Sequence, residues 1–182
     1  MEQIKWPFLK QTWGIEFESS KGAYLYTKDG RKILDAAGGA IVNNIGYGRE
    51  EVADAISRAV INNSYILPPF LTPEREALLD ELRNHWLPPH LTRIHLSSGG
   101  SEANESAVKL AIQYQASRGK PEKNIILTRS LSYHGTTLNM SGISGHEARK
   151  RGLESYVPSP TTIETPYPLR CPLGSFHPDS KD

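Results

Sequence analysis

The sequence has little of several features that mark specialised classes of protein. It contains one cysteine, Cys171, which excludes an internal disulfide framework and a cysteine zinc site. It has no excess of charge, with 21 Lys and Arg residues against 20 Asp and Glu residues and a net charge of +1. This balance provides no basic surface of the kind that binds nucleic acid or acidic membranes.

Long apolar runs and a targeting signal are also lacking. No apolar run approaches the ~20 residues of a membrane span, and Met1 leads into polar positions without a signal-peptide core. We therefore expect a cytoplasmic protein with no membrane partner and no nucleic-acid partner. The chain has 182 residues, 37% of them apolar and 23% charged, which is typical of a globular chain that forms one domain, with or without an added arm.

The pattern along the chain predicts three parts. Residues 1–60 would hold an arm, a β-hairpin around Asp29-Gly30 and an amphipathic helix over 52–60. Residues 61–157 would hold further helices and strands, with Thr72 and Pro73 opening a helix. Residues 158–182 hold six of the 13 prolines, so we expect an irregular tail without a central strand.

The middle of the chain predicts a β-α-β unit. Residues 93–97 alternate as a strand does, residues 102–117 have the apolar pattern of a helix, and residues 124–128 form a second, buried strand. Together they have the length of a unit that builds a parallel sheet.

A glycine turn, Ser98-Gly99-Gly100-Ser101, joins the first strand to the helix. Free N–H groups at a helix N-terminus and the Ser101 hydroxyl suit a phosphate group, although a turn of this kind is also common as plain structure. The pattern of a Walker loop and the GxGxxG pattern are both absent. Glu102 and Glu105 also have a simple explanation, because acids in the first turn complement the helix dipole.

A second loop, Ser132-Tyr133-His134-Gly135, follows the second predicted strand. Tyr133 offers a ring for stacking on a flat heterocycle, and His134 can donate or accept a proton near neutral pH. Ligands of open parallel sheets gather at the C-terminal ends of the strands, so both loops are expected at one edge. An ordinary half-buried contact is the simpler alternative for this pair, and Arg149 to Arg151 predict a solvated face.

The segment Leu96–Ala111 closely resembles the N-terminal half of class III aminotransferases, which are pyridoxal-phosphate (PLP) enzymes of the aspartate-aminotransferase-like fold, PLP fold type I. The Ser-Tyr-His-Gly loop at 132–135 matches the family as well. Further similar positions run from Tyr26 to Gly39 and over Arg170-Cys171-Pro172, so the resemblance spans about residues 20–174. It implies an α/β fold in which residues 61–157 form part of the family's PLP-binding large domain, with an incomplete sheet, and residues 1–60 contribute to its small domain.

The resemblance implies a role for each matching residue. Gly100 and Ser101 would bind the cofactor phosphate, Tyr133 would stack on the pyridine ring, His134 would lie beside it, and Glu102 would support the site. More loosely, Trp13 and the loop at 65–70 would line a substrate pocket. The implied partners are an amine or amino acid, a 2-oxo acid and a second copy of the chain in a homodimer.

The chain departs from the family in one respect that decides its chemistry. The family's cofactor-binding lysine, its aspartate facing the pyridine nitrogen and its partner-contributed threonine all follow the tyrosine–histidine loop at a distance. None of the ten lysines lies in the family's catalytic context, so we expect no catalytic residue here and an N-terminal fragment that is inactive alone.

Two other interpretations remain open from the sequence. The chain could be a cofactor-binding or dimerisation module that pairs with a full-length homologue. It could also be an unrelated nucleotide-binding α/β domain, although that class needs an acidic residue at the end of the second strand, and Glu122 precedes that strand.

Overall fold

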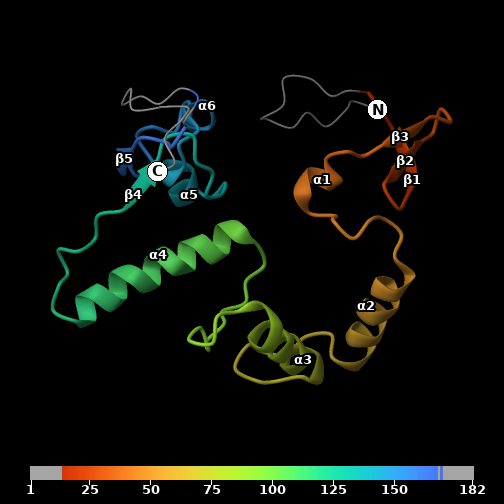
Figure 1. Cartoon of the computed structure of the whole chain (residues 1–182), viewed down its shortest axis with the longest axis horizontal. Helices are drawn as coiled ribbons and strands as arrows, with labels where there is room; N and C mark the ends of the chain where they lie inside the picture. The colour runs from red at the N-terminus through yellow and green to blue at the C-terminus, as the bar shows by residue number, and fades with distance from the viewer. Residues whose placement is uncertain (1–13, 168, 170–182) are drawn as a thin grey trace. The chain divides into compact units, whose positions relative to one another are not determined.

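The computed structural model describes residues 14–167 and 169 (Figure 1). The chain divides into two compact units, Met1–Pro89 and His90–Asp182, and each unit has its own sheet.

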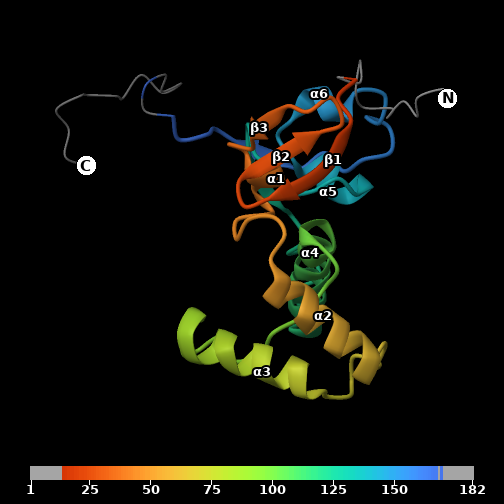
Figure 2. The ribbon, with the colours of Figure 1, turned by 90° about the vertical axis from the view of Figure 1, so that its right-hand side faces the viewer.

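The first unit begins with a three-stranded antiparallel meander (Figure 2). Strand β1 (Phe17–Lys21) pairs with β2 (Tyr24–Thr27), and β2 pairs with β3 (Lys32–Leu34). The predicted hairpin is therefore confirmed, with Gly30 at a φ of 84° in its turn. The predicted arm is corrected in part, because residues 17–20 belong to a strand, while residues 1–13 lie outside the described part of the chain.

Four helical segments follow in this unit. They are a short left-handed turn, α1 (Gly38–Ile41), the amphipathic helix α2 (Glu50–Asn62), α3 (Pro73–Glu81) and a π-helical turn, η1 (Leu82–Trp86). The start of α3 agrees with its sequence, since the Thr72 hydroxyl accepts a hydrogen bond from the Arg75 N–H and Pro73 opens the helix.

The second unit is built on the long helix α4 (Gly100–Ser117) and a parallel pair of strands. Strand β4 (Leu127–Arg129) lies beside β5 (Thr161–Ile163), and α5 (Leu138–Ile143) and α6 (Glu147–Lys150) come between them in the chain. A β-α-β unit therefore exists, but its crossover contains α5 and α6 instead of α4.

Two predicted strands differ from the structure. Residues 93–97 have no strand structure, because an alternating segment forms a strand only where a neighbour completes its hydrogen bonds, and no described segment lies beside it. The strand predicted at 124–128 is shorter and later, at 127–129. Inside the predicted irregular tail, the β-branched residues 161–163 form β5; with only two strands in the sheet, β5 is an edge strand, where nearby prolines are tolerated.

The buried part of the described chain is small and centres on α5. Met140 is 1% exposed and Ile143 is 5% exposed, and the hydroxyls of Thr128 and Ser144 are buried beside them. Large apolar side chains elsewhere remain open to solvent, among them Leu110 at 67% and Ile125 at 75%. Among the described helices, none combines the length and the apolar character that crossing a membrane requires.

Candidate cofactor site

The glycine turn leads directly into α4, as the sequence predicts. The first N–H groups of a helix have no acceptor within it, and those of Gly100, Ser101 and Glu102 take part in no hydrogen bond among the described residues. A Cβ atom added at Gly99 or Gly100 would meet nothing within 4 Å. The turn is therefore open, and it presents three N–H donors at the positive end of an 18-residue helix.

Glu102 holds this turn in place. One of its carboxylate oxygens, Oε2, accepts a hydrogen bond of 2.8 Å from the Ser98 N–H, one residue before the N-cap Gly99. The contact resembles a capping box, in which an acid in the first turn reaches back to the chain ahead of the helix. This bond restrains the turn in which the three N–H donors lie.

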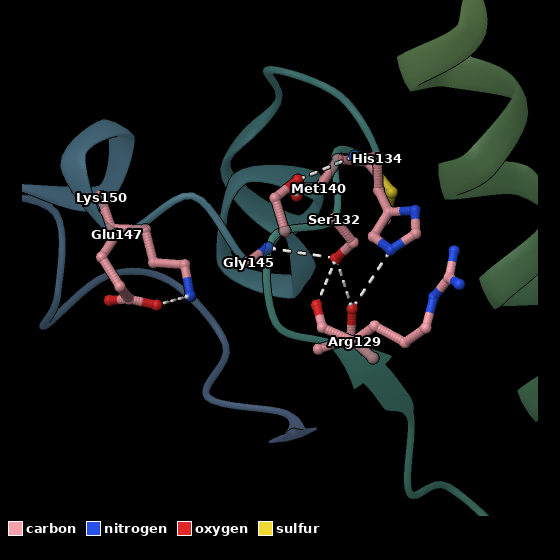
Figure 3. Close-up of polar contacts among 9 residues, drawn as sticks. Arg129, Ser132, His134, Met140, Gly145, Glu147 and Lys150 are labelled. Carbon is pink, nitrogen blue, oxygen red and sulfur yellow. Dashed lines mark hydrogen bonds and ion pairs between the residues drawn. The ribbon is translucent and has the colours of Figure 1, made fainter. Parts of the chain in front are cut away.

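Hydroxyl groups hydrogen-bond to Ser132 and His134 of the tyrosine–histidine loop (Figure 3). The His134 Nε2 atom lies 3.1 Å from the Thr128 Oγ1 atom, and the His134 N–H donates to the Ser144 hydroxyl over 2.9 Å. The Ser132 hydroxyl lies 3.0 Å from Thr128 Oγ1 and accepts from the Gly145 N–H. These contacts place the half-buried His134 ring at the end of β4 and leave the Tyr133 ring 54% exposed.

The two loops meet, as the sequence predicts. The Thr136 N–H donates to the Ser101 hydroxyl oxygen over 3.0 Å, and the Asn104 side-chain amide donates to the His134 carbonyl over 2.8 Å. Both contacts join residues that are at least 30 positions apart in the chain. A hydroxyl can accept and donate at once, so the Ser101 proton stays available to a further acceptor.

Gly135 makes this close approach possible. Its φ is +141°, and a Cβ atom at this position would lie 2.5 Å from the Ser101 Oγ atom and 3.0 Å from the Met140 Cβ atom. Since no side chain fits there, glycine is required by geometry as well as by backbone conformation.

Several supporting residues carry no signal in the sequence. The Glu105 carboxylate accepts from the Thr137 hydroxyl over 2.6 Å and from the Asn139 amide over 3.0 Å, so it does more than complement the helix dipole. The prediction of a solvated face for Arg149 is incomplete, because its guanidinium carbon lies 5.0 Å from the centre of the Tyr133 ring. The periodicity of the sequence cannot reveal these contacts, since each joins two segments whose distance from each other is set by the fold.

The first unit contains a cavity of about 440 Å³, lined in part by Asp35, Gly38 and Tyr47. The Asp35 carboxylate accepts from the Tyr47 hydroxyl and the Gly39 N–H, each over 2.7 Å, and these bonds lower the pKa of Asp35. The close backbone approach expected around Gly38 and Gly39 is present, since a Cβ at Gly39 would lie 3.2 Å from the Tyr47 hydroxyl.

The residues predicted to line a substrate pocket fall in different places. Trp13 lies outside the described residues, and Tyr65 and Phe70 are exposed. Sequence reasoning missed Arg75, whose guanidinium donates to the carbonyl groups of Ile66 and Phe70 and so holds the loop between them.

A family model excludes one of the open interpretations. The model of the class-III aminotransferases matches residues 10–178, nearly the whole chain. The chain belongs to the class III aminotransferases. An unrelated nucleotide-binding domain is therefore excluded.

The curated relatives of this aminotransferase chain are longer than the chain itself. A probable aminotransferase of Mycobacterium tuberculosis is 35% identical over 88% of this chain and 34% of its own length. The putrescine–pyruvate aminotransferase of Pseudomonas aeruginosa is 29% identical over 81% of this chain and 33% of its own length. The chain thus spans about a third of these relatives.

Solved structures confirm the predicted fold class. An amine transaminase from an uncultivated Pseudomonas species, solved with PLP bound, has a TM-score of 0.86 and 25% identity over 98% of this chain and 42% of its own. An omega-transaminase from Thermomicrobium roseum has a TM-score of 0.77 and 28% identity over 88% of this chain and 36% of its own. The aminotransferase chain is therefore part of a fold type I large domain with an incomplete sheet, and PLP is the cofactor of its family, as predicted.

Proposed function

We propose that this chain is the N-terminal part of a PLP-dependent class III aminotransferase and forms one side of its cofactor site. The observation that carries the proposal is the contact between the open glycine turn and the tyrosine–histidine loop, through Ser101 with Thr136 and Asn104 with His134. An anion-binding turn joined to a loop that carries an exposed aromatic ring suits a phosphorylated heterocycle better than either feature alone.

The turn would bind the phosphate. The N–H groups of Gly100 and Ser101 would donate to its oxygens, and the Ser101 hydroxyl would donate the proton that its contact with Thr136 leaves free. The α4 dipole adds to this attraction for a dianion. Glu102 would not touch the phosphate. It would support the site by accepting the hydrogen bond of the Ser98 N–H, which restrains the shape of the turn.

The loop would bind the ring. Tyr133 would stack on the pyridine, and His134 would border it, held at its backbone by Ser144 and at its ring by Thr128. When bound, PLP would supply the aldehyde carbon that carries an amino group from an amine or amino acid to a 2-oxo acid, and the electron-withdrawing ring that makes this transfer possible. The residues named here orient the cofactor and exclude water from one side of it.

The chain would be inactive alone, because no lysine lies in the family's catalytic context. Lys109 is on α4 after the glycine turn, and Lys150 pairs with Glu147 over 2.9 Å on α6. The family's substrates would require the rest of the site. Relatives act on putrescine with pyruvate and on hypotaurine or taurine with pyruvate, so we propose an amine or amino acid and a 2-oxo acid as substrates, and a homodimer as the complete assembly.

A second proposal is a non-catalytic module that pairs with a full-length homologue. It is favoured by an apolar groove of about 710 Å³ between α4 and residues 122–126, lined by side chains that include Val108, Ala111 and Ile125. Such a surface favours association because its burial removes apolar area from water. Sedimentation of the chain with and without a full-length class III aminotransferase would separate the two proposals.

An absorbance titration with PLP, with and without borohydride, tests the first proposal. We expect weak, displaceable binding that borohydride does not make permanent, and that Tyr133→Ala and Ser101→Ala abolish. Tyr156→Ala and Ser117→Ala are matched controls, since Tyr156 is exposed in the same unit and Ser117 lies at the other end of α4. Both controls should bind as the unaltered chain does.

Two results would contradict the proposal. A band fixed by borohydride to a single lysine would show a working lysine in this chain, against the expected inactivity. Equal binding by the Tyr133→Ala variant and the unaltered chain would place the cofactor elsewhere.

A further inference from the structure

The first turns of α4 contact the tyrosine–histidine loop through one face of the helix. Ser101, Asn104 and Glu105 are three and four positions apart, so their side chains project from the same side. Ser101 contacts the backbone of Thr136, directly after the loop, and Asn104 contacts the His134 carbonyl within it. Glu105 reaches further, to the first turn of α5.

Glu105 acts on α5 through two separate donors. Its Oε1 atom accepts from the Thr137 hydroxyl over 2.6 Å, and its Oε2 atom accepts from the Asn139 amide over 3.0 Å. Thr137 is the N-cap of α5, and its hydroxyl also accepts from the Met140 N–H over 3.4 Å. A carboxylate with one donor on each oxygen fixes both the position and the rotation of that first turn.

The same short helix fixes His134 from its other end. The Ser144 hydroxyl, at the C-cap of α5, accepts from the His134 N–H over 2.9 Å and donates to the Met140 carbonyl over 2.7 Å. A shift of α5 therefore moves the acceptor on which the His134 backbone depends. Met140 and Ile143, the buried apolar side chains among the described residues, both lie on α5, so their packing favours a shift of the helix as a whole.

We propose that Glu105 is a positioning residue of the cofactor site, which sets the distance of the Tyr133 and His134 rings from the glycine turn by anchoring α5 to α4. The inference rests on the proposed function, because it concerns the same cofactor. It adds a residue that would touch neither phosphate nor ring, and assigns it the alignment of the two halves of the site.

The consequence is a selective loss of affinity. The glycine turn belongs to α4 and keeps its N–H groups whether or not α5 is anchored, so binding of phosphate alone should not depend on Glu105. A ligand with both phosphate and ring needs both halves aligned, so binding of PLP should depend on it. A variant that merely destabilised the unit would weaken both ligands together.

The experiment compares Glu105→Gln with the unaltered chain in three measurements. These are the dissociation constant for PLP, the dissociation constant for inorganic phosphate, and the exchange rate of the His134 amide hydrogen without any ligand. We expect the PLP constant to rise about five- to tenfold, since one charged acceptor is lost. The phosphate constant should stay within about twofold, and His134 amide exchange should speed up by a similar five- to tenfold factor.

Asn139→Ala removes one of the two donors to Glu105 and keeps the test valid should the Glu105 variant fold poorly. It should weaken PLP binding less than Glu105→Gln does, and the double variant should lose little more affinity than Glu105→Gln alone, because Asn139 acts through Glu105. Glu122→Gln is the matched control; its side chain makes no hydrogen bond among the described residues of the same unit. It should change none of the three measurements.

The outcomes separate this inference from the proposed function. Faster His134 exchange in a chain that binds no PLP would support the positioning role and contradict cofactor binding by the chain alone. Unchanged exchange, or equal weakening of PLP and phosphate, would overturn the positioning role whatever the cofactor result.

Discussion

The two units differ in how far apart in the sequence their contacts reach. In the first unit, β1, β2 and β3 follow one another within Phe17–Leu34, and the polar contacts of Asp29 and Asp35 span no more than 12 positions. In the second unit, α4 contacts the tyrosine–histidine loop across at least 30 positions. Local contacts form cheaply, whereas distant ones must first overcome the entropy of closing a long loop. The site of the second unit is thus the part that a single substitution disrupts most.

A side chain added at Gly135 should have the largest effect on stability and on PLP binding. Gly135→Ala would place a Cβ atom 2.5 Å from the Ser101 Oγ atom, so the loop must move away from α4. We expect the second unit to lose about 2 kcal/mol of its free energy of unfolding and PLP to bind at least about tenfold more weakly. Chemical denaturation and PLP titration measure these two quantities.

Gly119→Ala is the control for that substitution. Gly119 has a φ of +72° at the end of α4, and an added Cβ would meet nothing within 4 Å. It should cost about 1 kcal/mol for its backbone conformation and leave PLP binding unchanged. Equal effects of the two substitutions on PLP binding would mean that the contact between the loops does not form the site.

The corresponding substitution in the first unit is Asp35→Asn. It removes the charge that accepts from the Gly39 N–H and the Tyr47 hydroxyl. We expect the Gly39 amide hydrogen to exchange roughly tenfold faster, because bonds to charged acceptors are the stronger ones. Exchange in β4 and α5 should not change. A matching loss of protection in both units would mean that they unfold as one body, and the comparison between them would fail.

Acid should lower the stability of the meander in the first unit, because folding lowers the pKa of two of its carboxyl groups. The guanidinium of Arg31, with the Thr27 hydroxyl, lowers the pKa of Asp29 to about 2, and Lys28 lowers the pKa of Glu16. A carboxyl whose pKa is lowered by folding stabilises the fold above its unfolded value, and this contribution disappears as the pH falls through the folded value. For Asp29 that window runs from 3.8 down to about 2.

We therefore expect the meander to loosen between pH 4 and pH 2 in exchange experiments on residues 17–34. Asp29→Asn should remove the part of this dependence that belongs to Asp29. An unaltered pH profile in that variant would assign the acid sensitivity to other groups. High salt should weaken the effect, because these charges are exposed.

The local elements were predictable from the sequence, and the distant contacts were not. The Asp29-Gly30 turn and the Thr72-Pro73 helix start depend on a few neighbouring residues, so composition and spacing are enough to predict them. Residues 93–97 alternate correctly but have no strand beside them among the described residues, and no pattern within a segment reports on its neighbours. The prediction of an irregular segment at β5 was wrong for a related reason. The strand forms because β4 provides it with a partner, despite the surrounding prolines.

The site was predictable to a similar degree. The glycine turn and the tyrosine–histidine loop have recognisable residues. Their contact was predicted because both were expected to follow strands of one sheet, although only the tyrosine–histidine loop follows a strand among the described residues. Asn104, Glu105 and Ser144 join the two loops but have ordinary surface or helix chemistry, so nothing in the sequence separates them from solvated residues. Their roles depend on the distance between α4 and α5.

The smallest expected effect comes from a pair of cation–ring contacts, one in each unit. The Lys32 ammonium lies 3.9 Å from the centre of the Tyr24 ring, and the Arg149 guanidinium carbon lies 5.0 Å from that of Tyr133. Lys32→Gln and Arg149→Gln should each cost about 0.5–1 kcal/mol of stability, the usual value at an exposed ring. Only Arg149→Gln should also weaken PLP binding, by about two- to fivefold, because only Tyr133 would stack on the cofactor. Thermal melts and PLP titrations of both variants check this, and tighter binding by Arg149→Gln would instead mean that the guanidinium covers the ring face that the cofactor needs.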